Sequence, residues 1–190
     1  LLLTIKTLSA ETVEAFSFGN LKKAKGNLNG KLNIKGKTDS PQINGNIAFD
    51  AFSFVLPQTQ ATYKINKQNL QFEGQNILLK NFILQDSLQQ NLITDGSISL
   101  KNLPDVAYNL NIKANNFLAL NTTRKDNDFV FGNAKINPLM NIQGVGSNYK
   151  INGKVKVNAG SELTMIMPDD VGSEESKDGI VQFINLAEEQ

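Results

Sequence analysis

The sequence of 190 residues contains no cysteine and no histidine. Without cysteine, the chain forms no disulfide and offers no thiolate as a nucleophile or metal ligand. Without histidine, it lacks the commonest general base, the usual zinc ligand and the side chain that ordinarily titrates near neutral pH. These two absences argue against an enzyme and against a zinc site.

Other functional classes are also poorly supported. The net charge is only +1, which is too balanced for a protein dedicated to binding nucleic acid. The sequence has no G-x-S-x-G nucleophile motif and no phosphate-binding loop ending in Gly-Lys-Ser/Thr. Asp86, Asp95 and Asp105 are interpreted as turn and strand-end residues rather than as catalytic acids. We therefore predict a non-enzymatic protein that uses no cofactor and no metal.

Apolar and polar residues alternate along most of the sequence. In GNLNGKLNIKGKTDSPQINGNIAFD, residues 26–50, Leu28, Leu32 and Ile34 share one parity and polar residues occupy the other. Such strict alternation is typical of a half-buried strand. Similar runs, separated by turn residues, predict about ten to twelve strands in an antiparallel arrangement. The parity slips near residues 52–57 and 76–79, which predicts bulges or corners there.

Helices are expected only near the two ends. Residues 9–23 fit a short amphipathic helix with Ser9 as its N-cap, and residues 178–189 fit either a helix or a last strand. We divide the chain into a lead-in strand and short helix (1–23), a β-rich body (24–168), and an acidic linker with a C-terminal amphipathic element (169–190). The initial LLLTIKTL is too short to cross a membrane, and we interpret the chain as a piece of a longer protein.

The alternation also predicts a large apolar face. Some 40 inward residues at about 30 Å² each give about 1,000 Å² or more, which soluble monomers rarely expose. A closed β-sandwich, a lipocalin-type barrel and an open curled sheet all satisfy this pattern. Glycines on the same parity suit a bend or the close approach of a ligand. The residues predicted to line the face are Leu28, Leu32, Ile34, Ile43, Ile47, Phe49, Tyr63, Ile65, Leu70, Phe72, Ile98, Leu100, Tyr108, Leu110, Ile112, Ile151, Val155 and Val157.

The order of these motifs resembles the repeated phrase of the TamB family, the large envelope proteins of the translocation and assembly module. That phrase is G-x-L-x-G-x-L-x-I-x-G, a polar turn with Pro, and then x-I-x-G-x-I-x-F, and it matches the stretch from Gly26 to Phe49. The segments FSFVLPQTQATYKINKQNLQFEGQNILLKNFILQDS and NFLALNTTRKDNDFVFGNAKI are similar to the form of the family found in Bacteroidetes-type bacteria. The resemblance covers about residues 20–168.

The resemblance implies a mainly β fold whose strands stack into an elongated, curled groove, shaped like a taco, with an apolar lining. It implies a periplasmic segment of a protein anchored in the inner membrane, with an outer-membrane barrel of the BamA or TamA type as partner. The implied ligands are phospholipid acyl chains or apolar β-strands of client proteins, and adjoining segments of the same chain extend the groove. The implied roles are phospholipid transport and the assembly or secretion of outer-membrane proteins and autotransporters. The alternative is a structural or adhesive β-sandwich.

Overall fold

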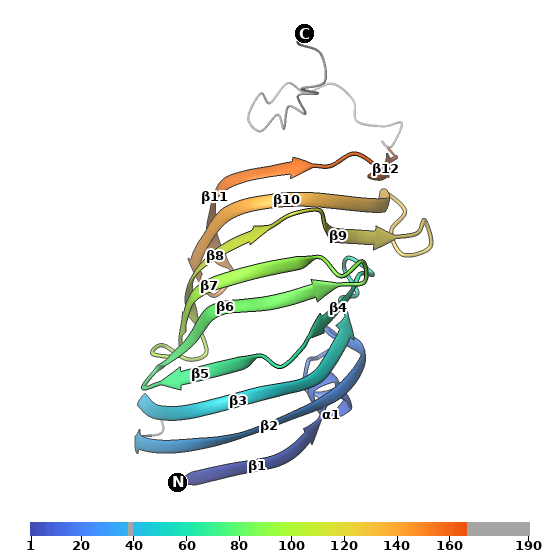
Figure 1. Cartoon of the computed structure of the whole chain (residues 1–190). Helices are drawn as coiled ribbons and strands as arrows, with labels where there is room; N and C mark the ends of the chain where they lie inside the picture. Colours follow the sequence, from blue (N-terminus) through green and yellow to red (C-terminus); the bar gives the residue numbers. More distant parts are fainter. Residues whose placement is uncertain (38–39, 167–190) are drawn as a thin grey trace.

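A computed structural model describes residues 1–37 and 40–166 (Figure 1). These residues form one sheet of 12 strands and one short helix, so the predicted mainly β, curled antiparallel fold is confirmed. The C-terminal amphipathic element predicted within 169–190 lies outside the described residues. The elements are β1 (Leu2–Ser9), α1 (Ala10–Ala15), β2 (Lys22–Lys37), β3 (Ser40–Val55), β4 (Thr62–Ile65), β5 (Asn69–Glu73), β6 (Asn76–Asp86), β7 (Asn91–Ser99), β8 (Ala107–Ala114), β9 (Phe117–Thr122), β10 (Val130–Val145), β11 (Asn148–Val157) and β12 (Glu162–Met165).

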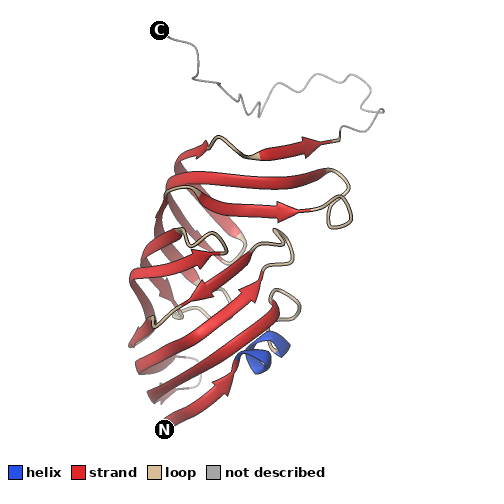
Figure 2. Cartoon of the chain, turned by 45° about the vertical axis from the view of Figure 1, so that its right-hand side comes forward, coloured by secondary structure: helices blue, strands red, loops and turns tan. Residues whose placement is uncertain are grey.

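The sheet is a meander in which neighbours in sequence are mostly neighbours in space. Its main path runs β1-β2-β3-β4-β6-β7-β8-β10-β11, and β5 pairs with β3 and β6, while β9 and β12 pair with β10. Every pairing is antiparallel because short polar turns reverse the chain, including the predicted turns between Glu73 and Asn76 and between Val145 and Asn148. The levels stack from β1 at one end to β11 and β12 at the other (Figures 1 and 2).

The sheet bends along a line that crosses nearly all of its levels. The ladders shift register between Ile5 and Leu8, and between Leu79 and Phe82, and β3 changes its partner from β5 to β4 between Ala48 and Phe52. The parity slips predicted near 76–79 and 52–57 therefore correspond to real irregularities, displaced by two to four residues.

The bend divides the sheet into two walls. We call the part of the sheet that contains β5, β8, β11 and the strand segments paired with them the long wall. The short wall comprises β4, β9, β12 and their paired segments.

Residues at this bend adopt a left-handed backbone conformation that non-glycine residues rarely use. The φ angle is 49° at Ala51, 49° at Lys67, 49° at Asn81 and 53° at Asn116. Such residues are found in β-bulges, which bend a strand and raise its twist. The left-handed conformation therefore destabilises the folded state by about 1 kcal/mol at each bend residue. The sheet curls at these positions.

Glycines on the apolar parity bring neighbouring strands together rather than leaving room for a ligand. A Cβ built on Gly45 would collide with the carbonyl oxygen of Lys31, and one on Gly96 would collide with that of Asn109. Both glycines have a φ of 142°. Of the two explanations left open by the sequence, a bend or the close approach of a ligand, these contacts support the bend, because the backbone conformation of the curled sheet leaves no space for a Cβ at these positions.

The buried core lies at the bend and in the short wall, on the side that α1 covers. Aromatic rings run through it, with centroids 5.4 Å apart for Phe49 and Phe52, 6.0 Å for Phe54 and Tyr63, and 5.4 Å for the stacked pair Tyr63 and Phe117. Helix α1 starts at the predicted cap, because the Ser9 side chain accepts a hydrogen bond from Thr12 N. The buried hydrophobic cluster contains Ala10, Ala24, Leu28, Phe49, Phe52, Phe54, Ala61, Tyr63, Ile65 and Phe117.

Candidate functional site: an apolar face that opens toward the last strands

Cross-strand register aligns apolar residues into rows that run the length of the sheet. Because antiparallel partners point to the same face, a row of paired residues shares one side of the sheet. One row crosses five neighbouring strands of the long wall and contains Leu79, Gly96, Leu110, Ile142 and Ile151. A second row contains Leu3, Leu32, Gly45, Phe72, Ile77, Ile98, Tyr108, Gly144 and Tyr149.

The eighteen residues predicted to line the apolar face fall into three groups by exposure. The side chains of the first group are buried in the core of the chain itself: Leu28, Leu32, Phe49, Tyr63 and Ile65. Those of the second group are half-buried on the long wall: Ile34, Ile43, Ile47, Leu70, Phe72, Ile98, Leu100, Tyr108, Leu110 and Ile112. The third group is exposed on the last long strand: Ile151, Val155 and Val157. All but Leu100 lie within strands, and Leu100 directly follows β7.

The apolar face is therefore covered most tightly between β2 and β4 and is exposed toward both edges of the sheet, including Leu3 on β1, which is 41% exposed. Around β2 to β4, the side chains pack against each other, as the 3% exposure of Tyr63 and the 7% exposure of Leu32 show. On β11 and β12, the inward residues are uncovered, with 54% exposure at Ile151 and 61% at Met165. A ligand that contacts this face without displacing the core has access from β6 onward, and most freely at β11 and β12.

An open hollow of about 560 Å³ lies near the β10–β11 turn, where β8, β10 and β11 meet. Tyr108, Gly144 and Tyr149 line it from the apolar face, and its other lining residues belong to the outer face: Asn109, Gln143, Val145, Asn148 and Lys150. The Tyr108 hydroxyl donates a hydrogen bond of 3.3 Å to the carbonyl oxygen of Gly146, which holds the ring against this turn. The hollow therefore lies at the edge between the two faces of the sheet and is not a pocket of the apolar face alone.

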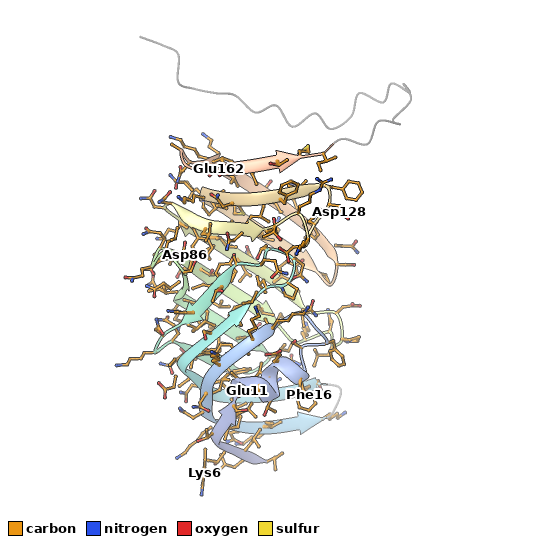
Figure 3. All side chains as sticks on the ribbon, turned by 90° about the vertical axis from the view of Figure 1, so that its right-hand side faces the viewer. Lys6, Glu11, Phe16, Asp86, Asp128 and Glu162 are labelled. Carbon is orange, nitrogen blue, oxygen red and sulfur yellow. The ribbon has the colours of Figure 1, made fainter. Side chains whose placement is uncertain are left out.

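The sequence did not reveal the most important polar group inside the bend. Asp86, interpreted from the sequence as a turn residue, has only 1% exposure. Its Oδ1 accepts hydrogen bonds from Leu88 N and Gln90 N, each 2.8 Å long, and its Oδ2 accepts one of 2.6 Å from Leu118 N. The carboxylate thus joins the tip of the β6–β7 hairpin to β9, and Figure 3 labels Asp86 among the side chains. Nothing in the local sequence distinguishes Asp86 from an ordinary turn aspartate.

Tyr63 faces the same region of the short wall. Its hydroxyl lies 3.3 Å from the carbonyl oxygens of Leu118 and of Ala119. Burial raises the pKa of this hydroxyl above its ordinary value; a hydrogen bond with Thr59 partly offsets this rise, and the nearby Asp86 carboxylate adds to it. Tyr63 and Asp86 therefore close the short wall by connecting β4 and β6 to β9, and their hydrogen bonds account for them as structural groups.

The remaining chemistry of the described residues is limited. Within residues 1–37 and 40–166, no three side chains of Asp or Glu come together as a metal site. None of the helices in the described part of the chain is long and apolar enough to cross a membrane. Asp95, expected at a strand end, lies inside β7 and accepts a hydrogen bond of 2.7 Å from the bend residue Asn81.

The fold and the apolar face together define a mainly β protein, in which a single bent antiparallel sheet presents one apolar surface along its length. The model of the TamB C-terminal domain matches residues 80–190, more than half of the chain, and the chain belongs to the TamB family. Membership of this family indicates a role in the translocation and assembly module and an association with the cell envelope. Comparisons with curated proteins and with solved structures found no match.

Proposed function

We propose that this chain is a segment of a periplasmic groove that holds the acyl chains of phospholipids as they pass between the two membranes. The observation that carries the proposal is the continuous apolar face, whose exposure rises from the buried core to the uncovered residues of β11 and β12. In the whole protein, an inner-membrane anchor and further groove segments would adjoin this one.

The dimensions of the accessible face suit an acyl chain. Strands β6, β7, β8, β10 and β11 are successive neighbours, so the open part of the face extends about 20 Å along the groove. Each methylene group that leaves water contributes about 0.8 kcal/mol, and a chain laid along this face contacts one row of aliphatic side chains after another. The binding is non-directional, which suits a ligand that has to slide.

The alternative of a closed β-sandwich is less well supported. A sandwich needs a second sheet to cover the apolar face, and the described residues form a single sheet. A lipocalin-type barrel needs its first and last strands to pair, whereas in the described residues β1 pairs with β2 and β11 pairs with β10.

A role in the assembly of outer-membrane proteins is favoured by a different observation. Strand β11 has all ten of its residues exposed and pairs only with β10 among the described residues. A strand with one free edge is a template for another strand. An apolar client strand, an adjoining segment of the same chain or an outer-membrane barrel of the BamA or TamA type is the expected partner at this edge.

The acyl-chain proposal is tested by placing a charge on the apolar face and, as a control, next to it on the outer face. Ile112 and Asn111 are neighbours on β8 that point to opposite faces. An arginine at 112 can extend to solvent from an open groove, so Ile112→Arg is expected to retain the β circular dichroism spectrum but to lose uptake of a fluorescent phospholipid. Asn111→Arg is expected to retain both.

Two results would contradict the proposal. Global unfolding of Ile112→Arg would identify the site as an ordinary closed core, where a charge has no path to water. Normal lipid uptake by a folded Ile112→Arg protein would show that acyl chains do not use this face.

A further inference from the structure

The outer surface of the last long-wall strands has an unusual composition. We call it the amide face and define it by the outward-facing positions within residues 107–113, 137–145 and 148–156 of β8, β10 and β11. Of these fourteen positions, seven are asparagine or glutamine, four are lysine and none is acidic. The lysines are Lys113, Lys150, Lys154 and Lys156, and all four are exposed.

Hydrogen bonds within the amide face orient its amides outward. Asn141 Nδ2 donates to the Oδ1 atoms of Asn109 and Asn111, at 2.7 Å and 3.1 Å. Because an asparagine side chain has one acceptor oxygen and two N–H donors, the Nδ2 groups of Asn109 and Asn111 remain available to a ligand. The row of paired residues continues from Asn141 to Asn152 on the edge strand.

An open depression of about 300 Å³ lies in this face. Its outward-facing lining consists of Asp95, Asn111, Lys113, Leu139, Asn141 and Asn152. Leu139 is 66% exposed and is paired with Lys113 on one side and Lys154 on the other. The single carboxylate, Asp95, accepts a hydrogen bond from Asn81 N. The depression therefore combines an apolar contact with flanking cations and amide groups.

We infer that the amide face binds the acidic glycan of the cell wall, a polysaccharide of acetamido sugars that carries carboxylates. Acetamido groups pair with amide side chains as both donors and acceptors, and carboxylates form charge-assisted hydrogen bonds with lysine. The exposed Leu139 offers a contact for the C–H face of a sugar ring. The inference draws on the envelope association of the family and not on the proposed passage of acyl chains, which would use the opposite face of the same strands.

Lysines on an edge strand also prevent unwanted strand pairing, and this role explains only part of the face. Lys150, Lys154 and Lys156 lie on the edge strand β11, but Lys113 and most of the amides lie on β8 and β10, which have partners on both sides. Edge protection requires no complementary amides and no depression. From Lys150 to Lys156 the cations extend about 20 Å, which suits an extended polymer.

The test is co-sedimentation of the full chain with purified peptidoglycan sacculi. Replacing Lys113 and Lys154 by glutamine removes two charge-assisted contacts, and we expect about a tenfold loss of affinity. The matched control replaces Lys31 and Lys35, which are exposed on the outer face of β2, and is expected to bind normally. Ile98→Arg changes the apolar face on β7, outside the lining of the depression, and is expected to bind sacculi normally, so failure of the acyl-chain proposal and failure of this inference are distinguishable.

Several outcomes would overturn the inference. Equal losses in the two double variants would indicate non-specific attraction to the net charge. Stronger competition by lipopolysaccharide than by soluble peptidoglycan fragments would assign the face to a different glycan. Binding that appears only after Asp169, Asp170, Glu174 and Glu175 are neutralised would make the acidic segment of this chain the occupant. Unchanged binding by the Lys113 and Lys154 variant would exclude the amide face.

Discussion

Replacing Asp86 by alanine should destabilise the protein more than any other single loss of a polar side chain described above. The change removes three hydrogen bonds to a carboxylate that is 1% exposed. Two of the donors, Leu88 N and Gln90 N, belong to a surface turn where water replaces the carboxylate, so each costs about 0.5–1.5 kcal/mol. The third donor, Leu118 N, is buried, and leaving it unpaired costs about 1–3 kcal/mol.

The sum predicts that Asp86→Ala lowers the free energy of unfolding by about 2–6 kcal/mol. Urea denaturation followed by circular dichroism measures this value. Asp86→Asn keeps one acceptor oxygen and should lose roughly half as much. Asp95→Ala, which removes one partly exposed bond to Asn81 N, should cost about 1 kcal/mol. A loss below about 1 kcal/mol for Asp86→Ala would refute the role of this carboxylate in closing the short wall.

Three further predictions concern the bend and the core. Ala51→Gly should raise the free energy of unfolding by about 0.5–1 kcal/mol, because glycine tolerates the φ of 49° at this position; Ala48→Gly, in a regular strand segment, should lower it instead. Gly96→Ala should cost about 2–3 kcal/mol, because the added Cβ collides with the backbone of Asn109 and Leu110, and an equally stable variant would contradict the close approach. The pKa of Tyr63 is raised in the folded state, so its contribution to stability is complete below the unfolded pKa of about 10 and is lost as the pH rises through the folded pKa. Tyr63→Phe should therefore show a weaker fall in stability above pH 10, and identical pH profiles would refute this.

Much of the fold follows from local sequence patterns because the strands are long and alternate strictly. The register of β2 with β3 puts Ile34 opposite Ile43 and Leu28 opposite Phe49, as the parity of residues 26–50 requires. The turns at 73–76 and 145–148 lie where glycine and asparagine occur together. A slip of one residue would turn the whole apolar set outward, so the pattern specifies the register strongly.

The parts that the sequence does not predict depend on contacts across the bend. Alternation alone does not say that Phe49, Tyr63 and Ile65 are buried among the aromatic residues of the short wall, while Ile151 and Val155 remain exposed at the other end. The burial of Asp86 depends on the approach of Leu118, which is 32 residues away in the sequence. Left-handed residues such as Ala51 and Lys67 at the bend carry no distinctive sequence signal, since neither is glycine or asparagine.

The central claim is that acyl chains contact one face of the sheet and leave the other free. The most direct measurement places a photo-crosslinking amino acid at each of residues 149–152 of β11 in the full-length protein in its native envelope, and then identifies lipid adducts by mass spectrometry. The account predicts phospholipid adducts at positions 149 and 151, whose side chains share the apolar face with Gly144 and Ile142, and none at positions 150 and 152. Adducts of equal yield at all four positions, or at none of them, would contradict the claim.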